Sequence, residues 1–163
     1  MRHLTPPVRQ AGMTLIELMV GLSIAALLSM TAAPYFAEYT TNSKLREGGN
    51  LLLAETLLAQ SEAIKRNRTV RVSSSGAAIQ VLDMNDPLNP VVLRERALSR
   101  NVTAGISTID FGSEGRPMPF GTAGAMNISM TGITCTGDLR CPGLRVDAGG
   151  AVRLCGDRVN SCS

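Results

Sequence analysis

The hydropathy pattern of the chain changes twice along its length. Apolar residues run almost without interruption from Met13 to Ala33, a stretch long enough to span about 30 Å as a helix, which is the thickness of a bilayer core. From Leu45 to Ile64, apolar positions recur at helical spacing. The pattern predicts one helix over residues 13–67, transmembrane over residues 13–33 and amphipathic after Pro34.

The amphipathic half of this helix needs a surface to cover its apolar stripe. The predicted stripe consists of Leu45, Leu52, Leu53, Thr56, Leu57, Gln60 and Ile64, with charged residues such as Glu55 largely on other faces. Gly48 and Gly49 interrupt the stripe, and each glycine costs a helix about 1 kcal/mol relative to alanine. We therefore expect a bend at this glycine pair.

After Arg68 the chain changes to short β-rich runs separated by Gly, Pro, Asn, Asp and Ser. These runs are TVRVSS, AAIQVLD, PVVLRERAL, ISTIDFG, MNISM, GLRVDAG and AVRLC. They predict antiparallel strands packed over the helical stripe, so the fold class is α+β with a globular head at residues 68–163. Three adjacent charges in the third run, Arg94, Glu95 and Arg96, are typical of a solvent-exposed face or of a charge-protected sheet edge.

Composition and charge exclude several functional classes. The 163 residues carry a formal charge of +3; residues 1–12 hold Arg2 and Arg9 and no acid, so without them 14 basic residues face 13 acidic ones, or +1. A near-neutral chain does not indicate a nucleic-acid binder. His3 is the one histidine, which excludes histidine-dependent triads and metal sites downstream. Without a phosphate loop or nucleophile elbow either, we expect no enzyme, no metal and no cofactor.

Glu17 is the unusual residue of the apolar run. A carboxylate in the centre of a membrane helix costs roughly 2.5 to 3.5 kcal/mol, so it needs a partner. An ordinary secretory signal fits poorly, because Pro34 follows the small residues at its possible cleavage site. Cleavage between Gly12 and Met13 would instead create an ammonium one turn from Glu17. In an assembly of parallel helices, Glu17 of one subunit could then pair with the Met13 amine of the next and set their register.

Gly12, the segment Met13-Thr14-Leu15-Ile16-Glu17 and the apolar run together resemble the class III signal of type IV pilins and type II secretion pseudopilins. The resemblance implies that residues 1–12 are a leader removed by prepilin peptidase and that Met13 is then N-methylated. Met13 departs from the phenylalanine usual at this position. Pro34 falls where pilins commonly carry a helix-breaking proline. The precursor would be a single-pass inner-membrane protein with its head in the periplasm.

The second half of the head narrows the resemblance. IDFGSEGRP at residues 109–117, then MNISM and GLRVDAGGAVRLC, is similar to the GspH/FimT/FimU group of minor pilins and pseudopilins. This implies a type IV pilin-like fold and a minor pilin that joins other minor and major pilins through its helix, near the tip of a type IV pilus at the cell surface. The alternative is a minor pseudopilin of a periplasmic type II secretion pseudopilus.

A third function, DNA uptake, would depend on basic residues near the C-terminus. FimT-like relatives that take up DNA carry a Gly-Arg-x-Arg element there, whereas this chain has Gly150-Ala151-Val152-Arg153. Fewer phosphate contacts make DNA binding weaker and more salt-sensitive. The candidate DNA contacts are Arg145, Arg153 and Arg158.

Four cysteines fall near the C-terminus: Cys135, Cys141, Cys155 and Cys162. No pair has the spacing of a zinc knuckle or a thioredoxin-like site, so we expect disulfides formed in an oxidising compartment. Short separations favour Cys135 with Cys141 and Cys155 with Cys162. Pairing of Cys135 with Cys155 or Cys162 is the alternative, because a longer loop gives a larger entropic stabilisation.

Overall fold

A computed structural model describes residues 12–135, 139–159 and 162, so most of the predicted leader, residues 1–11, lies outside the described part. The chain divides into two compact units, residues 1–37 and 38–163. Helix α1 (Leu15–Arg66) begins in the first unit and ends in the second.

The predicted helix break at Pro34 is wrong, because α1 continues through this residue. Proline lacks the N–H that would bond to the carbonyl one turn earlier, and this loss is local. The residues on both sides of Pro34 remain helical. At the C-terminal end, Asn67 adopts a left-handed φ of 51° and ends the helix, as an amide residue tolerates at that position.

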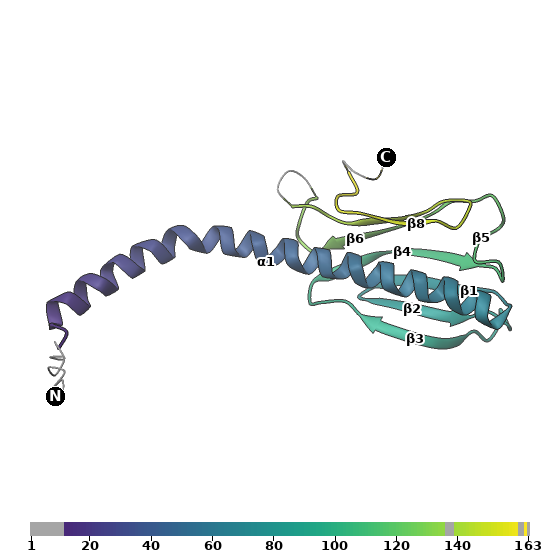
Figure 1. Ribbon diagram of the computed structural model, residues 1–163, viewed down its shortest axis with the longest axis horizontal. Helices are drawn as coiled ribbons and strands as arrows, with labels where there is room; N and C mark the ends of the chain where they lie inside the picture. Colours follow the sequence, from purple (N-terminus) through teal and green to yellow (C-terminus); the bar gives the residue numbers. More distant parts are fainter. Residues whose placement is uncertain (1–11, 136–138, 160–161, 163) are drawn as a thin grey trace, which may run out of the picture. The chain divides into compact units, whose positions relative to one another are not determined.

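The head contains a single antiparallel sheet of eight strands in the order β3-β2-β1-β4-β6-β7-β8, with β5 paired to β4 (Figure 1). The strands are β1 (Val70–Gly76), β2 (Ala78–Asp83), β3 (Val91–Ala97), β4 (Val102–Phe111), β5 (Pro117–Met118), β6 (Gly124–Met130), β7 (Gly143–Val146) and β8 (Val152–Cys155). Each of the seven predicted runs forms or joins a strand, which confirms the α+β fold class. The two-residue β5 is too short to leave a periodic signal in the sequence.

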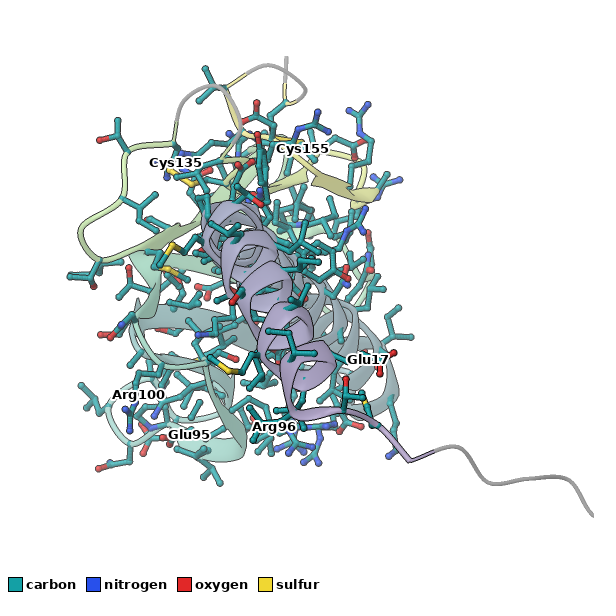
Figure 2. The ribbon with its side chains drawn as sticks, turned by 90° about the vertical axis from the view of Figure 1, so that its left-hand side faces the viewer. Glu17, Glu95, Arg96, Arg100, Cys135 and Cys155 are labelled. Atoms are coloured by element: carbon teal, nitrogen blue, oxygen red, sulfur yellow. A yellow bond between two sulfur atoms is a disulfide. The ribbon has the colours of Figure 1, made fainter. Side chains whose placement is uncertain are left out.

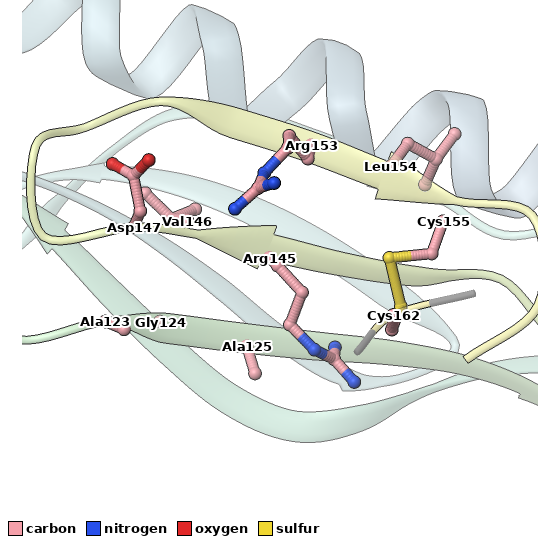
Figure 3. Close-up of a pocket in the computed structure, with 10 residues that line it drawn as sticks. All are labelled: Ala123, Gly124, Ala125, Arg145, Val146, Asp147, Arg153, Leu154, Cys155 and Cys162. Atoms are coloured by element: carbon pink, nitrogen blue, oxygen red, sulfur yellow. A yellow bond between two sulfur atoms is a disulfide. The ribbon is translucent and has the colours of Figure 1, made fainter. Parts of the chain in front are cut away.

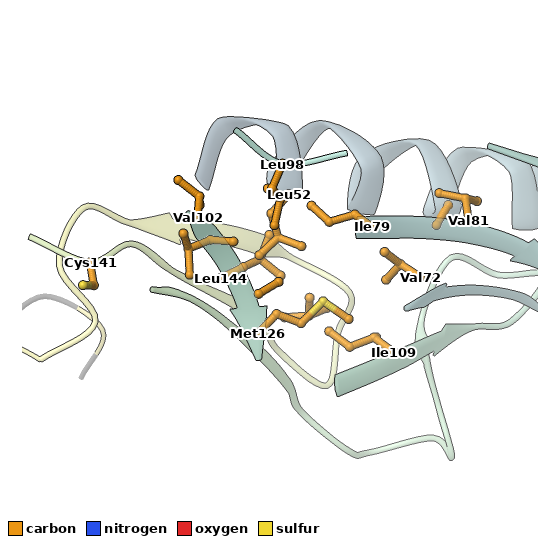
Figure 4. Packing of buried hydrophobic residues seen from close by; sticks show 14 of the residues in the cluster. Leu52, Val72, Ile79, Val81, Leu98, Val102, Ile109, Met126, Cys141 and Leu144 are labelled. Carbon is orange, nitrogen blue, oxygen red and sulfur yellow. The ribbon is translucent and has the colours of Figure 1, made fainter. Parts of the chain in front are cut away.

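The core lies between one face of the sheet and the second half of α1. Figure 4 shows Leu52 of the helix packed above apolar residues of several strands, among them Ile79, Val81 and Met126. Alternation along strands such as β2, where half-buried and buried positions alternate along the whole length, produces this face.

The glycine pair of α1 serves close packing. A Cβ at Gly48 would lie 3.0 Å from Val102 Cγ1, and one at Gly49 would lie 2.7 Å from Pro142 Cβ. Both glycines are buried. The pair therefore lets the helix backbone approach the sheet, a role that the predicted bend did not anticipate.

The buried face of α1 also differs from the predicted stripe. Leu57 and Ile64 are 46% and 55% exposed, whereas Ala59 and Ala63 are fully buried. Small residues therefore share the buried face with Leu45 and Leu52, which the predicted stripe included. Gln60 continues this face: its Nε2 donates to the carbonyls of Gly115 (2.7 Å) and Gly150 (2.8 Å) and joins two loops to the helix.

Candidate functional site

The N-terminus of α1 is closed by two reciprocal hydrogen bonds between Thr14 and Glu17. The Thr14 N–H donates to Glu17 Oε2 at 3.5 Å, and the Glu17 N–H donates to Thr14 Oγ1 at 3.3 Å. This is a capping box, which satisfies two of the backbone donors that every helix leaves free at its start. The Glu17 charge also interacts favourably with the helix dipole. The sequence held a signal for it that was overlooked, namely a threonine three residues before a glutamate ahead of an apolar run.

Two glycines near this end lie in open space within the described part of the chain. A Cβ at Gly12 or at Gly21 would meet no other atom within 4 Å, and neither residue has a left-handed φ. Gly21 lies inside α1, where glycine costs about 1 kcal/mol relative to alanine. Packing among the described residues therefore gives no reason for either glycine.

The apolar part of α1 is suited to a membrane by length and composition. An 18-residue window has a mean hydropathy of 2.0 and none of it is buried in the fold. The hydroxyls of Ser23, Ser29 and Thr31 donate to carbonyls of their own helix at 2.8 to 2.9 Å, so these polar groups are satisfied without water.

An unexpected charge cluster joins α1 to the edge strand β3. Glu55 is only 2% exposed, and its Oε1 lies 3.2 Å from Arg94 Nε and 3.8 Å from Arg96 Nε. Arg94 and Arg96 lie on the edge strand with side chains 41% and 51% exposed, as predicted, but they also pair with a buried carboxylate, which the sequence did not indicate. The two arginines face the helix because they stand opposite the buried Val81 and Ile79 in the sheet register. Glu95 points to the other face, where it accepts from Gln80 at 2.8 Å.

Figure 2 places Arg96 and Glu95 on the side of the head away from Cys135 and Cys155, as the strand order requires. Towards the middle of the sheet, Arg71 of β1 and Asp110 of β4 form a bidentate pair at 2.6 and 2.8 Å. The hydrogen bond to Asp110 raises the pKa of Arg71. Opposite charges therefore hold the sheet together on its solvent-facing side.

Two of the three candidate DNA contacts come together near the other edge of the sheet. Arg145 of β7 stands directly opposite Arg153 of β8, and Ala125 of β6 stands opposite Arg145. The three residues line a cavity of about 410 Å³ (Figure 3). Arg158 does not join them: its backbone N–H donates to the Cys141 carbonyl and its Nη2 lies 3.4 Å from Cys135 Sγ.

The cysteines form two disulfides, Cys135 with Cys141 and Cys155 with Cys162, which is the local pairing. The second disulfide fixes Cys162 beside the cavity between β7 and β8 (Figure 3). The first disulfide closes a loop in the connection between β6 and β7, and the second joins Cys162 to the end of β8.

The turn from Asp83 to Asp86 is held by its own hydrogen bonds and by arginines. Asp83 Oδ1 accepts from the Asn85 N–H, and its Oδ2 lies 3.5 Å from Arg66 Nη1. The Asn89 side chain, which donates to Asp86, lowers the pKa of that carboxyl. Within the described residues, no group of three or more His, Cys, Asp or Glu side chains is placed to hold a metal.

Two family models match the chain. One, described as type II transport protein GspH, matches residues 49–155, more than half of the sequence. The other, described as a prokaryotic N-terminal methylation motif, matches residues 8–33, which contain Gly12, Met13 and the Thr14–Glu17 cap. The two matches together cover the apolar stretch of α1 and every strand of the sheet.

Solved structures share the fold at low sequence identity. The type IV minor pilin FimU of Pseudomonas aeruginosa superposes with a TM-score of 0.59 at 19% identity, covering 77% of this chain and 99% of FimU. The minor pseudopilin EpsH from the type 2 secretion system of Vibrio cholerae gives a TM-score of 0.55 at 14% identity, covering 69% of this chain and 97% of EpsH. No curated protein sequence matches the chain significantly. At these identities the two structures support the fold and do not distinguish a pilus from a secretion machine.

Proposed function

Because the chain belongs to the GspH family of minor pilins and pseudopilins, we propose that it is a minor pilin that assembles through α1 into a type IV pilus, near its tip. The observation that carries this proposal is the exposed apolar stretch of α1, with one carboxylate at its start. Such a surface is stable only in a membrane or against other apolar helices. The membrane would surround this apolar stretch in the precursor. In the filament, the helices of other minor and major pilins would replace the membrane.

We further propose that prepilin peptidase cleaves after Gly12 and that the new Met13 amine is methylated. Open space around Gly12 supports this, because no packing among the described residues requires a glycine there. Cleavage converts the Met13 nitrogen from an amide to an ammonium close to Glu17.

In the filament, the Glu17 carboxylate of one subunit would accept a hydrogen bond from the Met13 ammonium of its neighbour. This contact would fix the axial stagger between the two subunits. The capping bond to Glu17 Oε2 is long, at 3.5 Å, and Glu17 Oε1 has no hydrogen bond in the described part of the chain. The carboxylate therefore has capacity for a second, charged donor. This contact offsets the cost of placing a carboxylate in an apolar layer.

A minor pseudopilin of a type II secretion system is the second candidate, favoured by the description of the matching family model. Both functions use the same helix contacts, so a deletion strain separates them. Loss of surface pili with normal protein secretion supports the pilus. Loss of secreted proteins with normal pili supports the pseudopilus and contradicts our first proposal. An epitope-tagged chain in sheared filaments, detected by immunoblot, tests assembly directly.

A further inference from the structure

We propose that the cavity between Arg145 and Arg153 binds a carboxylate side chain of a neighbouring protein subunit. This inference rests on the proposed assembly function, because it is assembly that places another subunit beside the head. It gives the head a contact of its own, apart from the helix contacts that define the filament.

The arrangement of the two arginines is the first observation. Arg145 and Arg153 are direct cross-strand partners in the β7–β8 register. Like charges placed directly opposite one another destabilise an antiparallel pair. In the described part of the chain, Arg153 has no ion pair or hydrogen bond, and it is exposed. A bound anion between the two guanidinium groups would remove this repulsion.

Arg145 is held in position for such an anion. Its Nη1 donates to Asn127 Oδ1 at 3.0 Å and to the Leu144 carbonyl at 2.9 Å. These bonds use one nitrogen and leave Nε and Nη2 for a ligand. A guanidinium fixed in this way loses little conformational freedom when it binds a carboxylate through two parallel hydrogen bonds.

The shape of the cavity favours a small anionic group. Its floor consists of Ala123, Gly124 and Ala125, whose small side chains leave a space of about 410 Å³ below the arginines. Asp147, the acid at the rim, uses Oδ1 to accept from the Gly149 and Ala151 N–H groups at 2.9 Å. Figure 3 shows Asp147 at the β7–β8 turn, with no ion pair to Arg153 among the described residues.

A protein carboxylate fits this site better than nucleic acid does. Strong nucleic-acid binding comes from many phosphate contacts, about six to ten in typical DNA-binding proteins. Here only two of the candidate arginines line the cavity, and the third, Arg158, is directed to Cys135. One aspartate or glutamate inserted between Arg145 and Arg153 would satisfy both. Apolar side chains of the same neighbour would contact the small residues of the floor.

The chemistry is tested by NMR titration of the mature full chain in detergent micelles. The probes are N-acetyl-glutamate, inorganic phosphate and a single-stranded DNA oligonucleotide. We expect saturable shifts of the Ala125, Arg145 and Arg153 amides with N-acetyl-glutamate. Arg153→Gln should weaken this binding about tenfold, the loss expected for a hydrogen bond to a charged group, and Arg153→Lys should weaken it less. Arg100→Gln, an exposed charge away from the cavity, is the matched control and should bind normally.

Three outcomes of the titration overturn the proposal. They are the absence of saturable binding of N-acetyl-glutamate, unchanged binding in Arg153→Gln, and binding of the oligonucleotide at these residues without binding of the carboxylate. The last result would assign the pocket to nucleic acid.

The source of the carboxylate is tested in assembled filaments. A photo-crosslinking phenylalanine analogue at Ala123 should form an adduct with another pilin, in a peptide that contains aspartate or glutamate. Adduct per incorporated chain should fall several-fold when Arg145 and Arg153 are both changed to glutamine. The proposed carboxylate contact alone would be overturned if filaments contain the chain but give no such adduct. An adduct that is unchanged when the arginines are replaced would have the same consequence. Absence of the chain from filaments would instead overturn the proposed function.

Discussion

Thr14 and Glu17 cap α1 reciprocally, each accepting the backbone N–H of the other, at 3.3 and 3.5 Å. Glu17 therefore has a partner inside its own subunit before any neighbour is present. This explains how the precursor tolerates a carboxylate at the edge of an apolar helix, since the charge lies at the positive end of the helix dipole. The same carboxylate is the group that we expect to meet the Met13 ammonium in the filament.

Substitutions at Glu17 separate these two roles. Glu17→Ala should be processed normally, because cleavage lies five residues earlier, and should fail to enter filaments. Glu17→Gln retains the acceptor that the capping box needs but loses the charge. The register hypothesis predicts that glutamine fails like alanine in an immunoblot of sheared filaments. Normal incorporation of Glu17→Gln would show that capping alone is required.

Gly12→Val should leave unprocessed precursor in the membrane. A Cβ at Gly12 meets no described atom within 4 Å, so we expect the loss to arise at the peptidase and not in the fold. Intact-mass spectrometry of the purified chain measures this. The same measurement on the unaltered protein should find a mature N-terminus at Met13. A mature N-terminus at any other residue would contradict the proposed cleavage site.

Gly49→Ala should destabilise the head although alanine is the better helix former. Overpacking typically costs about 1 to 3 kcal/mol, and the added methyl would lie 2.7 Å from Pro142 Cβ, in a ring that cannot rotate away. The gain in helix propensity is about 1 kcal/mol. Chemical denaturation followed by circular dichroism measures the difference. Gly21→Ala, which adds a methyl in open space, is the control and should show no loss.

Arg94→Ala should lower the free energy of unfolding by about 1 to 3 kcal/mol, because it leaves the buried Glu55 carboxylate with the more distant Arg96 alone. Glu55→Leu should lower the free energy of unfolding by less than Arg94→Ala does. Both arginines are half exposed, so water solvates them when their partner is gone. Denaturation midpoints of the two variants decide the order. Arg100→Ala serves as the control for removal of an exposed arginine, and a midpoint for Arg94→Ala equal to this control would contradict the prediction.

Non-reducing peptide mapping should recover crosslinked peptides joining Cys135 to Cys141 and Cys155 to Cys162. Alkylation without reductant should label none of these four cysteines. A peptide that joins Cys135 to Cys155 or to Cys162 would show that the long-range pairing is present in solution.

Most of the architecture was predictable from the sequence because it depends on local periodicity. An apolar run such as Met13 to Ala33 has few stable structures other than a helix, and alternating β-branched residues specify a half-buried strand. The position of Glu17 relative to Gly12 is likewise a matter of spacing along one chain. These features need no knowledge of which surfaces meet.

The tertiary structure decided which face of α1 is buried and which charges meet. Leu57 and Ile64 look like core residues by periodicity, yet they are exposed, whereas Gly48, Gly49 and Ala63 are buried beside Leu45 and Leu52. At Gly48 and Gly49 the helix backbone approaches the sheet too closely for a side chain, and only the packed sheet imposes that distance. The contact of Glu55 with Arg94 joins residues far apart in sequence. The pairing of Arg145 with Arg153 carries no local signal. They meet because strand order and register, set by burial of the whole sheet, bring their side chains to one place.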